Sequence, residues 1–264
     1  MLEIKNVYKT FNAGTVNEKI ALNDLSLHLK EGEFVTVIGG NGAGKSTMLN
    51  SIAGVYDVDE GNILIDGVDV THLQEYKRAQ YIGRVFQDPM MGTAATMQIE
   101  ENLALAARRG KRRTLRSGIT AAEREDYREK LKILDLGLED RMTAKVGLLS
   151  GGQRQALTLL MATLQQPKIL LLDEHTAALD PKTAAKVLEV TEKIVSANNL
   201  TTMMITHNMR DAIAYGNRLI MMYNGHIVVD ISGEEKKQLT VEQLLKLFSQ
   251  ASGSDEVDDK LVLG

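Results

Sequence analysis

The chain has 264 residues, of which 44% are hydrophobic and 25% charged, a composition that supports one large α/β domain or two lobes sharing a core. It has no cysteine, which excludes disulfides, thiolate metal sites and a thiol nucleophile, and its net charge of −4 implies no general affinity for nucleic acid. Residues 1–6 lack the pattern of a signal peptide and no apolar run approaches the ~18 residues that span a bilayer, so we expect any membrane-spanning part to come from another chain.

Short strands and turns are predicted before residue 34. The first strand begins at Leu2, and residues 25–29 alternate between leucine and polar side chains, which is the period of a half-buried strand. We place Tyr8 and Phe11 in the first loop, where either ring can stack on a purine or simply pack at a rim. Residues 34–38 form an apolar run that predicts a buried strand.

The residues after that strand have the pattern of a phosphate-binding loop. Its members are Gly39, Gly40, Asn41, Gly42, Ala43, Gly44, Lys45, Ser46 and Thr47, followed by a helical pattern that Gly54 ends. The glycines let backbone N–H groups point inward, and the positive end of the helix dipole adds to them. We expect Lys45 to reach the β- and γ-phosphates of a nucleotide and the Ser46 hydroxyl to bind Mg²⁺.

The middle of the chain changes from strands to helices. Residues 82–86 predict a strand, and Gln87, just past its end, is a candidate Mg²⁺ ligand through its amide oxygen. Residues 97–142 are rich in helix formers and predict a helical insertion, with an amphipathic helix over 121–135. Within it, the six positive side chains of residues 108–116 suit either a solvated surface or a patch near anionic lipid, where each contributes about 1 kcal/mol.

A second helix start suited to anions follows the insertion. Ser150 is a good N-cap for a helix that ends before Pro167, and Gly151, Gly152 and Gln153 come directly after it. The glycines leave the first N–H groups of the helix open. The segment can serve simply to cap the helix or to bind an anion, and its residues alone leave both possibilities open.

A wholly apolar run, residues 169–172, predicts a strand at the centre of a parallel sheet. It is followed by Asp173 and Glu174, and two carboxylates at the tip of a buried strand are costly unless they are used. Because side chains alternate along a strand, we expect the two to point in different directions. One can then hold a hydrated Mg²⁺ while the other orients or deprotonates a water.

The last third of the chain adds two candidate site residues. Asp180 is predicted to cap the next helix. His207 follows a buried strand over residues 202–206, and we expect it on the same sheet edge as Lys45 and Glu174. A hairpin at Asn224-Gly225, a helix over 241–248 and a frayed acidic tail at 255–259 complete the prediction.

These motifs, in this order, resemble the ATP-binding subunit of ABC transporters over about residues 1–235. In that resemblance Gly39–Ser46 matches Walker A, Gln87 the Q-loop, Leu149–Gln153 (LSGGQ) the signature, Ile169–Asp173 Walker B, Glu174 the catalytic glutamate, Asp180 the D-loop and His207 the switch histidine. Phe11 matches the aromatic residue that stacks on adenine better than Tyr8 does. The chain departs from the family at His175, where proline is usual, and we interpret this histidine as local structure.

The resemblance implies an α/β fold, a P-loop NTPase (RecA-like) core with a mainly parallel sheet, an N-terminal antiparallel β subdomain and an α-helical insertion at about 88–160. Residues 236–264 would be a C-terminal helix and tail. It also implies ATP and Mg²⁺ as cofactors. Lys45 would stabilise charge on the transferring phosphoryl group, and Ser46, Gln87 and Asp173 would organise Mg²⁺. Glu174 would polarise the attacking water, and His207 would contact the γ-phosphate.

The resemblance further implies a head-to-tail homodimer, with each ATP held between Walker A of one subunit and Ser150–Gln153 of the other. Residues 87–93 and 173–180 look like those of bacterial ATPases that work with a permease and a solute-binding protein to import amino acids, tryptophan or tyrosine among them. The protein would then be cytoplasmic and bound to the inner face of the plasma membrane through the permease, with no nucleic-acid partner. The alternatives are an exporter of lipid, peptide or drug, or a soluble ABC ATPase. The soluble ABC proteins have tandem domains or a long coiled coil, and neither is evident here.

Overall fold

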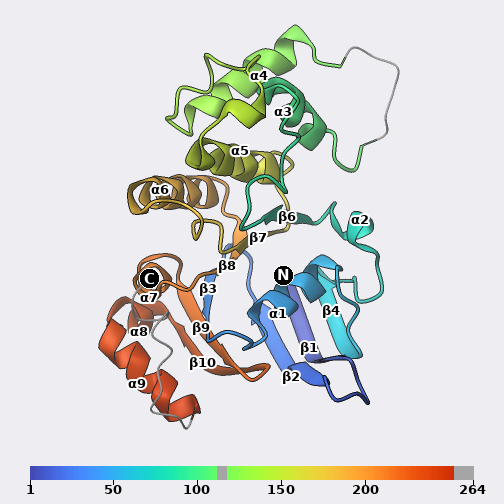
Figure 1. Cartoon of the computed structure of the whole chain (residues 1–264), viewed down its shortest axis with the longest axis vertical. Coiled ribbons are helices and arrows are strands. Elements are labelled where there is room, and N and C mark those ends of the chain that lie inside the picture. Colours follow the sequence, from blue (N-terminus) through green and yellow to red (C-terminus); the bar gives the residue numbers. More distant parts are fainter. Residues whose placement is uncertain (112–117, 253–264) are drawn as a thin grey trace.

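The chain, described by a computed structural model over residues 1–111 and 118–252, with side chains to residue 250, contains two sheets (Figure 1). The larger has the strand order β10-β9-β3-β8-β7-β6. Its strands are β3 (Phe34–Ile38), β6 (Ile82–Val85), β7 (Ile169–Asp173), β8 (Thr201–Ile205), β9 (Arg218–Tyr223) and β10 (His226–Ser232). All neighbours pair in parallel except the hairpin of β9 and β10. The predicted mainly parallel sheet is therefore confirmed.

The smaller sheet is antiparallel and has the strand order β2-β1-β4-β5. Its strands are β1 (Leu2–Phe11), β2 (Lys19–Leu29), β4 (Glu60–Ile65) and β5 (Val68–Asp69). The predicted N-terminal antiparallel sheet is confirmed, but the placement of Tyr8 and Phe11 in a loop is wrong. Pairing with β2 extends β1 as far as Phe11, which lies opposite Lys19.

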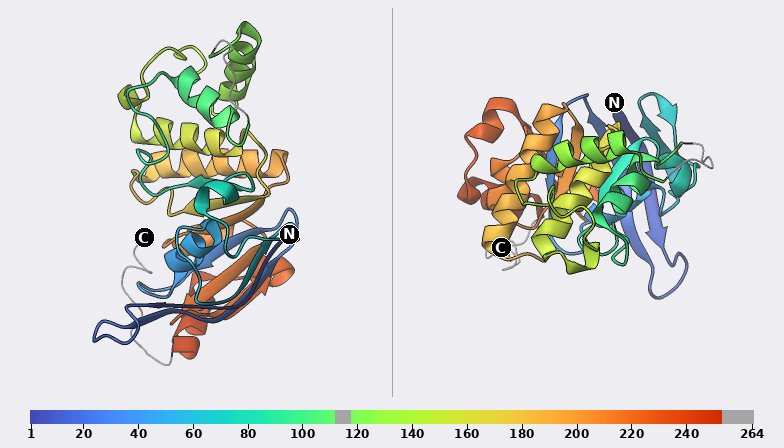
Figure 2. Two further views of the ribbon diagram at one scale, coloured as in Figure 1. Left: turned by 90° about the vertical axis from the view of Figure 1, so that its right-hand side faces the viewer. Right: turned by 90° about the horizontal axis from the view of Figure 1, so that it is seen from above.

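The helices are α1 (Lys45–Ala53), α2 (Glu75–Arg78), α3 (Ile99–Ala107), α4 (Ala121–Lys132), α5 (Gly151–Thr163), α6 (Pro181–Ala197), α7 (Met209–Ala214), α8 (Gly233–Lys237) and α9 (Val241–Ser252), with a 3-10 turn η1 (Val146–Leu148). Helices α3 and α4 lie at one end of the molecule, away from the antiparallel sheet, and α5 and α6 lie between them and the strands (Figures 1 and 2). Helices α3 and α4 confirm the helical character predicted for residues 97–142 in the described part of that segment. The domain boundaries at about 88, 160 and 235 stay a prediction.

Strand β7 separates two hydrophobic cores. Leu170 and Leu172 pack in a core with α3, α4 and α5, whereas Ile169 and Leu171 pack in a core between the two sheets that includes α1. Alternate side chains of a strand point to opposite faces, so a strand covered on both sides must be apolar throughout. This explains why the run 169–172 has no polar residue and why Asp173 falls at its end.

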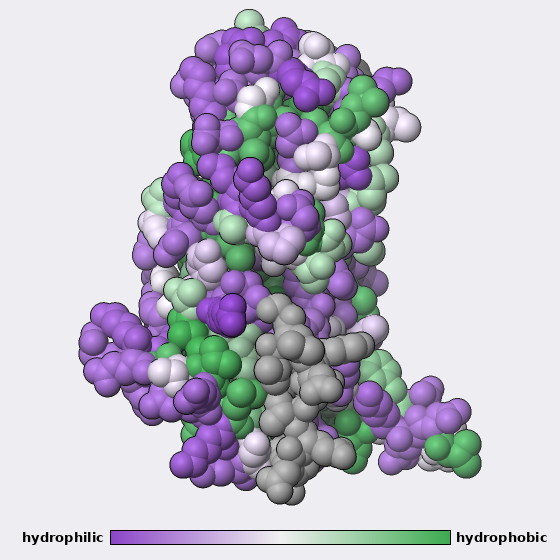
Figure 3. All heavy atoms as spheres, turned by 60° about the vertical axis from the view of Figure 1, so that its left-hand side comes forward, coloured by the Kyte–Doolittle hydropathy of each residue, from purple (hydrophilic) through white to green (hydrophobic). Residues whose placement is uncertain are grey.

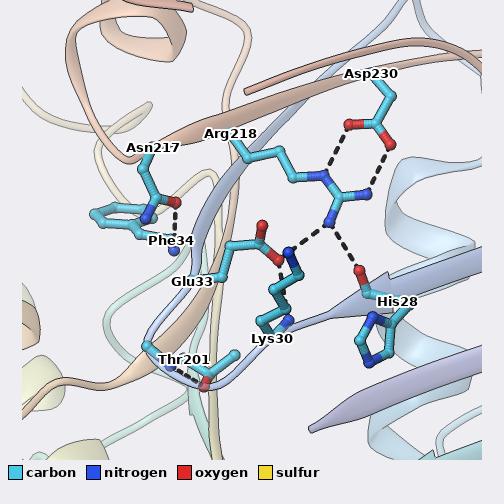
Figure 4. Close-up of polar contacts among 9 residues, drawn as sticks. His28, Lys30, Glu33, Phe34, Thr201, Asn217, Arg218 and Asp230 are labelled. Atoms are coloured by element: carbon cyan, nitrogen blue, oxygen red, sulfur yellow. Dashed lines mark hydrogen bonds and ion pairs between the residues drawn. The ribbon is translucent and has the colours of Figure 1, made fainter. Parts of the chain in front are cut away.

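A charged junction joins the two sheets (Figure 4). Arg218, at the start of β9, donates two hydrogen bonds to Asp230 at 2.7 and 2.6 Å. It also contacts the backbone oxygen of His28 at 2.7 Å and the carboxylate of Glu33 at 3.1 Å. These contacts tie the end of β2 to the hairpin of β9 and β10. The contacts with His28 and Glu33 were not predictable from local pattern, because these residues lie more than 180 positions from Arg218.

Two arginines of the basic stretch 108–116 make contacts inside the helical insertion. Arg108 pairs with Glu123 at 2.9 Å, and Arg109 donates to the backbone oxygen of Ala162 at 3.4 Å. These two side chains therefore hold α3 to neighbouring elements. Arg112, Arg113, Arg116 and the acidic tail 255–259 lie outside the described residues.

Within the described part of the chain, no helix is both long enough and apolar enough to cross a membrane. Hydrophilic residues predominate on the face drawn in Figure 3, and apolar residues form smaller groups among them.

Candidate active site

A cavity of about 220 Å³ lies where β3, β7 and β8 end. Its lining is Phe11, Lys19, Ala21, Asn41, Gly42, Ala43, Gly44, Lys45, Ser46, Thr47, Glu174 and His207. The carboxyl ends of neighbouring parallel strands meet at one sheet edge, which is where ligands of open α/β sheets bind. The structure therefore brings together the predicted loop, Glu174, His207 and Phe11. Tyr8 is not among the lining residues.

The loop before α1 packs too closely against neighbouring strands for side chains at two of its glycines. A Cβ on Gly39 would lie 2.3 Å from the backbone oxygen of Met222, and one on Gly44 would lie 2.4 Å from that of Ala21. Both have positive φ, at 149° and 105°. These glycines are required by packing as well as by the inward turn of the N–H groups.

Helix α1 begins at this cavity without a capping side chain. Its N-cap is Gly44, no side chain caps it, and its first turn contains no acidic residue. The first N–H groups of a helix have no intrahelical acceptor, so these donors suit an anion. Lys45 is buried, and its ammonium donates to the backbone oxygens of Gly39 and Gly40 at 2.7 and 3.1 Å. A polyphosphate fits this set of backbone donors and cation.

Glu174 and His207 meet at the same cavity. Oε1 of Glu174 lies 2.5 Å from Nε2 of His207, and this hydrogen bond lowers the pKa of Glu174 below its ordinary value. Glu174 lies just past the end of β7 and has φ of 46°. Glu174 lines this cavity and Asp173 does not, as expected if the two carboxylates point in different directions.

Asp173 and Gln87 line a neighbouring cavity of about 740 Å³ and not the first one. Burial raises the pKa of Asp173, and Arg84 opposes that shift from 3.5 Å. The same guanidinium donates to Oδ1 of Asn50, on α1, at 2.7 Å. Arg84 belongs to no motif and was not predicted as a site residue, although a charged residue within the apolar strand 82–86 is a usable signal.

The donor set is compatible with Mg²⁺. Among the described residues, no group of three or more His, Cys, Asp or Glu side chains could hold a metal ion by itself. Protein sites for Mg²⁺ commonly use one or two carboxylates and leave the other positions to water and phosphate. Ser46 in the first cavity, and Asp173 and the amide of Gln87 in the second, are among the oxygen donors that line these cavities.

The signature segment lies apart from both cavities. Ser150 caps α5 by accepting from the N–H of Gln153 at 3.3 Å, and the Gln153 side chain accepts from the N–H of Ser150 at 3.2 Å. Gly152 packs against Thr183, whose methyl group would lie 2.1 Å from an added Cβ. Asp180 caps α6 by accepting from the N–H of Thr183 at 3.1 Å. A single chain does not bring Ser150–Gln153 or Asp180 to the cavity of Lys45.

His175, the residue after Glu174, is buried. Its Nε2 lies 3.1 Å from the hydroxyl of Thr191, which itself donates to a backbone oxygen of α6. The ring therefore donates from Nε2, and burial lowers its pKa to about 4. The contact ties the loop after β7 to α6, which supports the interpretation of His175 as local structure.

Comparisons with known proteins agree with this geometry. The family model described as "ABC transporter" matches residues 22–177. The tyrosine transport ATP-binding protein of Clostridioides difficile is 46% identical over 95% of this chain and 100% of its own length. The phosphonates import ATP-binding protein PhnC of Lactobacillus johnsonii is 33% identical over 97% of this chain and 100% of its own.

Solved structures give the same result. The ATP-binding cassette MJ0796, in a dimeric post-hydrolysis state bound to ADP and Pi, superposes with a TM-score of 0.74 and 33% identity over 88% of this chain and 98% of its own. The cassette MJ1267 in its ADP conformation superposes with a TM-score of 0.77 and 27% identity over 94% of this chain and 98% of its own. The chain therefore belongs to the ABC transporter family, as an ATP-binding domain that hydrolyses ATP to drive transport.

Proposed function

We propose that this chain powers the import of an amino acid, with tyrosine or a closely related aromatic amino acid as the first candidate. The support is the identity of 46% with the tyrosine transport ATP-binding protein, which extends over 95% of this chain. One observation supports the ATPase mechanism above all. The start of α1, which no side chain caps, lies at the same cavity as Glu174 and His207. The cargo does not touch this subunit, so the substrate is inferred from the relative alone.

The residues of the cavity have different roles in phosphoryl transfer. Lys45 and the amides of the loop hold the phosphates and stabilise the charge that develops on them. Glu174 orients and polarises the attacking water, because its carboxylate lines the cavity and can accept a hydrogen bond from that water. His207 holds Glu174 in place from 2.5 Å and faces the position of the γ-phosphate.

Magnesium would be held by Ser46, Gln87 and Asp173, directly or through water. When bound, it neutralises phosphate charge as the phosphoryl group transfers. Arg84 would hold one oxygen of Asp173 in position. Its guanidinium lies 3.5 Å from Oδ2 of Asp173 and is itself hydrogen-bonded to Asn50.

A head-to-tail homodimer would complete each site. Ser150 is exposed at a capped helix start and lies outside the cavity of its own chain, so it is free to meet the cavity of a partner. A γ-phosphate between two positive helix ends would join the subunits, and hydrolysis would release them. The dimeric state of the cassette MJ0796 supports this arrangement.

A membrane permease would dock beside Gln87. Two neighbouring cavities, of about 310 and 740 Å³, share Phe86, Met91 and Arg84 in their walls. Met91 is 69% exposed and Met90 is 46% exposed, which leaves apolar surface next to a candidate ligand of the nucleotide site. Docking here would place the protein at the inner face of the plasma membrane, with a solute-binding protein on the other side.

A pull-down of the tagged protein from detergent-solubilised membranes tests this proposal. A permease that co-elutes with an extracytoplasmic binding protein supports an importer, and binding of tyrosine by that protein supports the substrate. A permease without a binding protein contradicts import, and the absence of any membrane protein contradicts a transport role for this chain. Met91→Glu provides a variant in which the permease is expected to be lost while ATP binding remains.

A further inference from the structure

Lys19 occupies a wall of the nucleotide cavity that none of the motifs covers. It is the first residue of β2 and lies directly opposite Phe11 in the pairing of β1 with β2. Side chains of directly opposed residues share one face of a sheet, so Lys19 and Phe11 are neighbours there. Both line the same cavity as Lys45.

The ammonium of Lys19 lies over the phosphate-binding loop. A Cβ built on Gly42 would be 3.1 Å from Nζ of Lys19, which places the cation beside the open side of that glycine. The side chain therefore extends from the strand that carries Phe11 to the loop that carries Lys45. Its ammonium is therefore beside Gly42 of the predicted phosphate loop, while its backbone is paired with Phe11, the predicted position of the base.

The charges around this ammonium suit a polyanion. Among residues 1–111 and 118–252, no carboxylate pairs with Lys19 and no acceptor takes its hydrogen bond, whereas Lys9 in the same sheet pairs with Asp59 at 2.8 Å. Two lysines thus line a cavity in which the acidic lining residue, Glu174, is already hydrogen-bonded to His207.

We infer that Lys19 is a nucleotide-binding residue whose ammonium contacts the α-phosphate, next to the base on Phe11. This inference rests on the ATP site described above and adds a residue to it. The charge of an α-phosphate does not change while the γ-phosphoryl group transfers. Lys19 therefore stabilises the ground state and the transition state equally, which affects KM and leaves kcat largely unaffected.

The test compares Lys19→Met and Lys19→Arg with Lys30→Met, a control at the other end of β2 and outside the cavity. Titration calorimetry on the full chain would measure Kd for ATP and ADP, and competition would measure adenosine. We expect Lys19→Met to raise Kd for ATP and for ADP by the same factor, about fivefold to tenfold, as for loss of one charge-assisted contact. KM should rise by that factor with kcat within about twofold, while adenosine and the Arg variant stay near wild type.

Ionic strength gives an independent readout. Because the contact is partly exposed, its effect should shrink between 50 mM and 500 mM salt, as screening requires. Unchanged Kd values for ATP and ADP in Lys19→Met would overturn the inference, and so would an equal loss in Lys30→Met or an equal loss of adenosine binding. A wild-type chain that binds no ATP would instead overturn the proposed function, so the two failures are distinguishable.

Discussion

At the scale of single residues, Glu174 has the most specific role. Its carboxylate lies 2.5 Å from His207 and lines the cavity at which α1 begins. We expect Glu174→Gln to bind ATP with near-normal affinity and to hydrolyse it at least about 100-fold more slowly, because the amide cannot accept a proton from water. Steady-state phosphate release and nucleotide binding measure the two effects separately. Near-normal turnover in this variant would refute the role, and Glu31→Gln, in an exposed turn, serves as control.

His175 makes stability depend on pH. Its pKa is about 4 in the folded protein, against 6.5 for the ordinary side chain, because burial disfavours the imidazolium. The unfolded chain therefore binds more protons between pH 6.5 and 4, and stability is fully present above 6.5 and is lost as the pH falls through that window. The loss approaches about 3 kcal/mol at 1.36 kcal/mol for each unit of pKa.

Urea denaturation of the wild type and of His175→Asn, at pH 7 and at pH 4.5, measures this term. The asparagine does not titrate and can still hydrogen-bond to Thr191. We expect the free energy of unfolding to fall between these pH values by about 2 kcal/mol more in the wild type than in the variant. Equal pH dependence in both proteins would contradict a buried, neutral imidazole.

Residue types in a local pattern were predictable, and contacts between distant residues were not. The loop 39–47 and the caps at Ser150 and Asp180 depend on neighbours within a few residues, so the sequence alone located them. Lys19 and Arg84 entered no motif, because their importance comes from what the fold places beside them. The left-handed conformation of Glu174 was missed for the same reason.

At the scale of elements, two buried cations bind helix ends that no motif identifies. Arg78 donates to the backbone oxygens of Ser51 and Ile52, at the end of α1, at 2.6 and 3.0 Å. Lys236 donates to the oxygens of Ile213, Tyr215 and Gly216, at the end of α7, at 2.6–3.0 Å. Both helices start at the nucleotide cavity or just after His207, so these distant cations support the elements that carry the site.

We expect Arg78→Met to destabilise the protein by about 3 kcal/mol, because it leaves several buried carbonyl oxygens without donors. Arg78 is 1% exposed and also donates to the oxygens of Thr71 and Leu73. The midpoint of urea unfolding measures the loss. Arg128→Met is a matched control, since this partly exposed arginine pairs with Glu125 three residues away and should change stability by less than about 0.5 kcal/mol. Similar effects in the two variants would contradict a capping role for Arg78.

At the scale of the whole molecule, the motifs predicted the family and the sheet. In the head-to-tail dimer that we propose, a second chain completes each site. The cavity contains Lys45, Glu174 and His207 from one chain, and Ser150–Gln153 begins a helix elsewhere on the same chain. If the dimer is head-to-tail, each site takes its loop from one subunit and its signature from the other. Two variants with opposite defects can then complement each other in a mixed dimer.

The variants are Lys45→Met, which disables the loop, and Ser150→Arg, which places bulk and positive charge at the signature. Each alone should lose nearly all ATPase activity, since both sites of either homodimer contain one defective half. An equimolar mixture forms mixed dimers as about half of its population, and each mixed dimer has one intact site. For independent sites the mixture should regain about a quarter of wild-type turnover, from dimer symmetry alone.

Thermal melting checks that Ser150→Arg stays folded, because loss of this cap costs only about 1 kcal/mol. A mixture that stays inactive although mixed dimers form would mean that one chain completes its own site, which contradicts the head-to-tail arrangement.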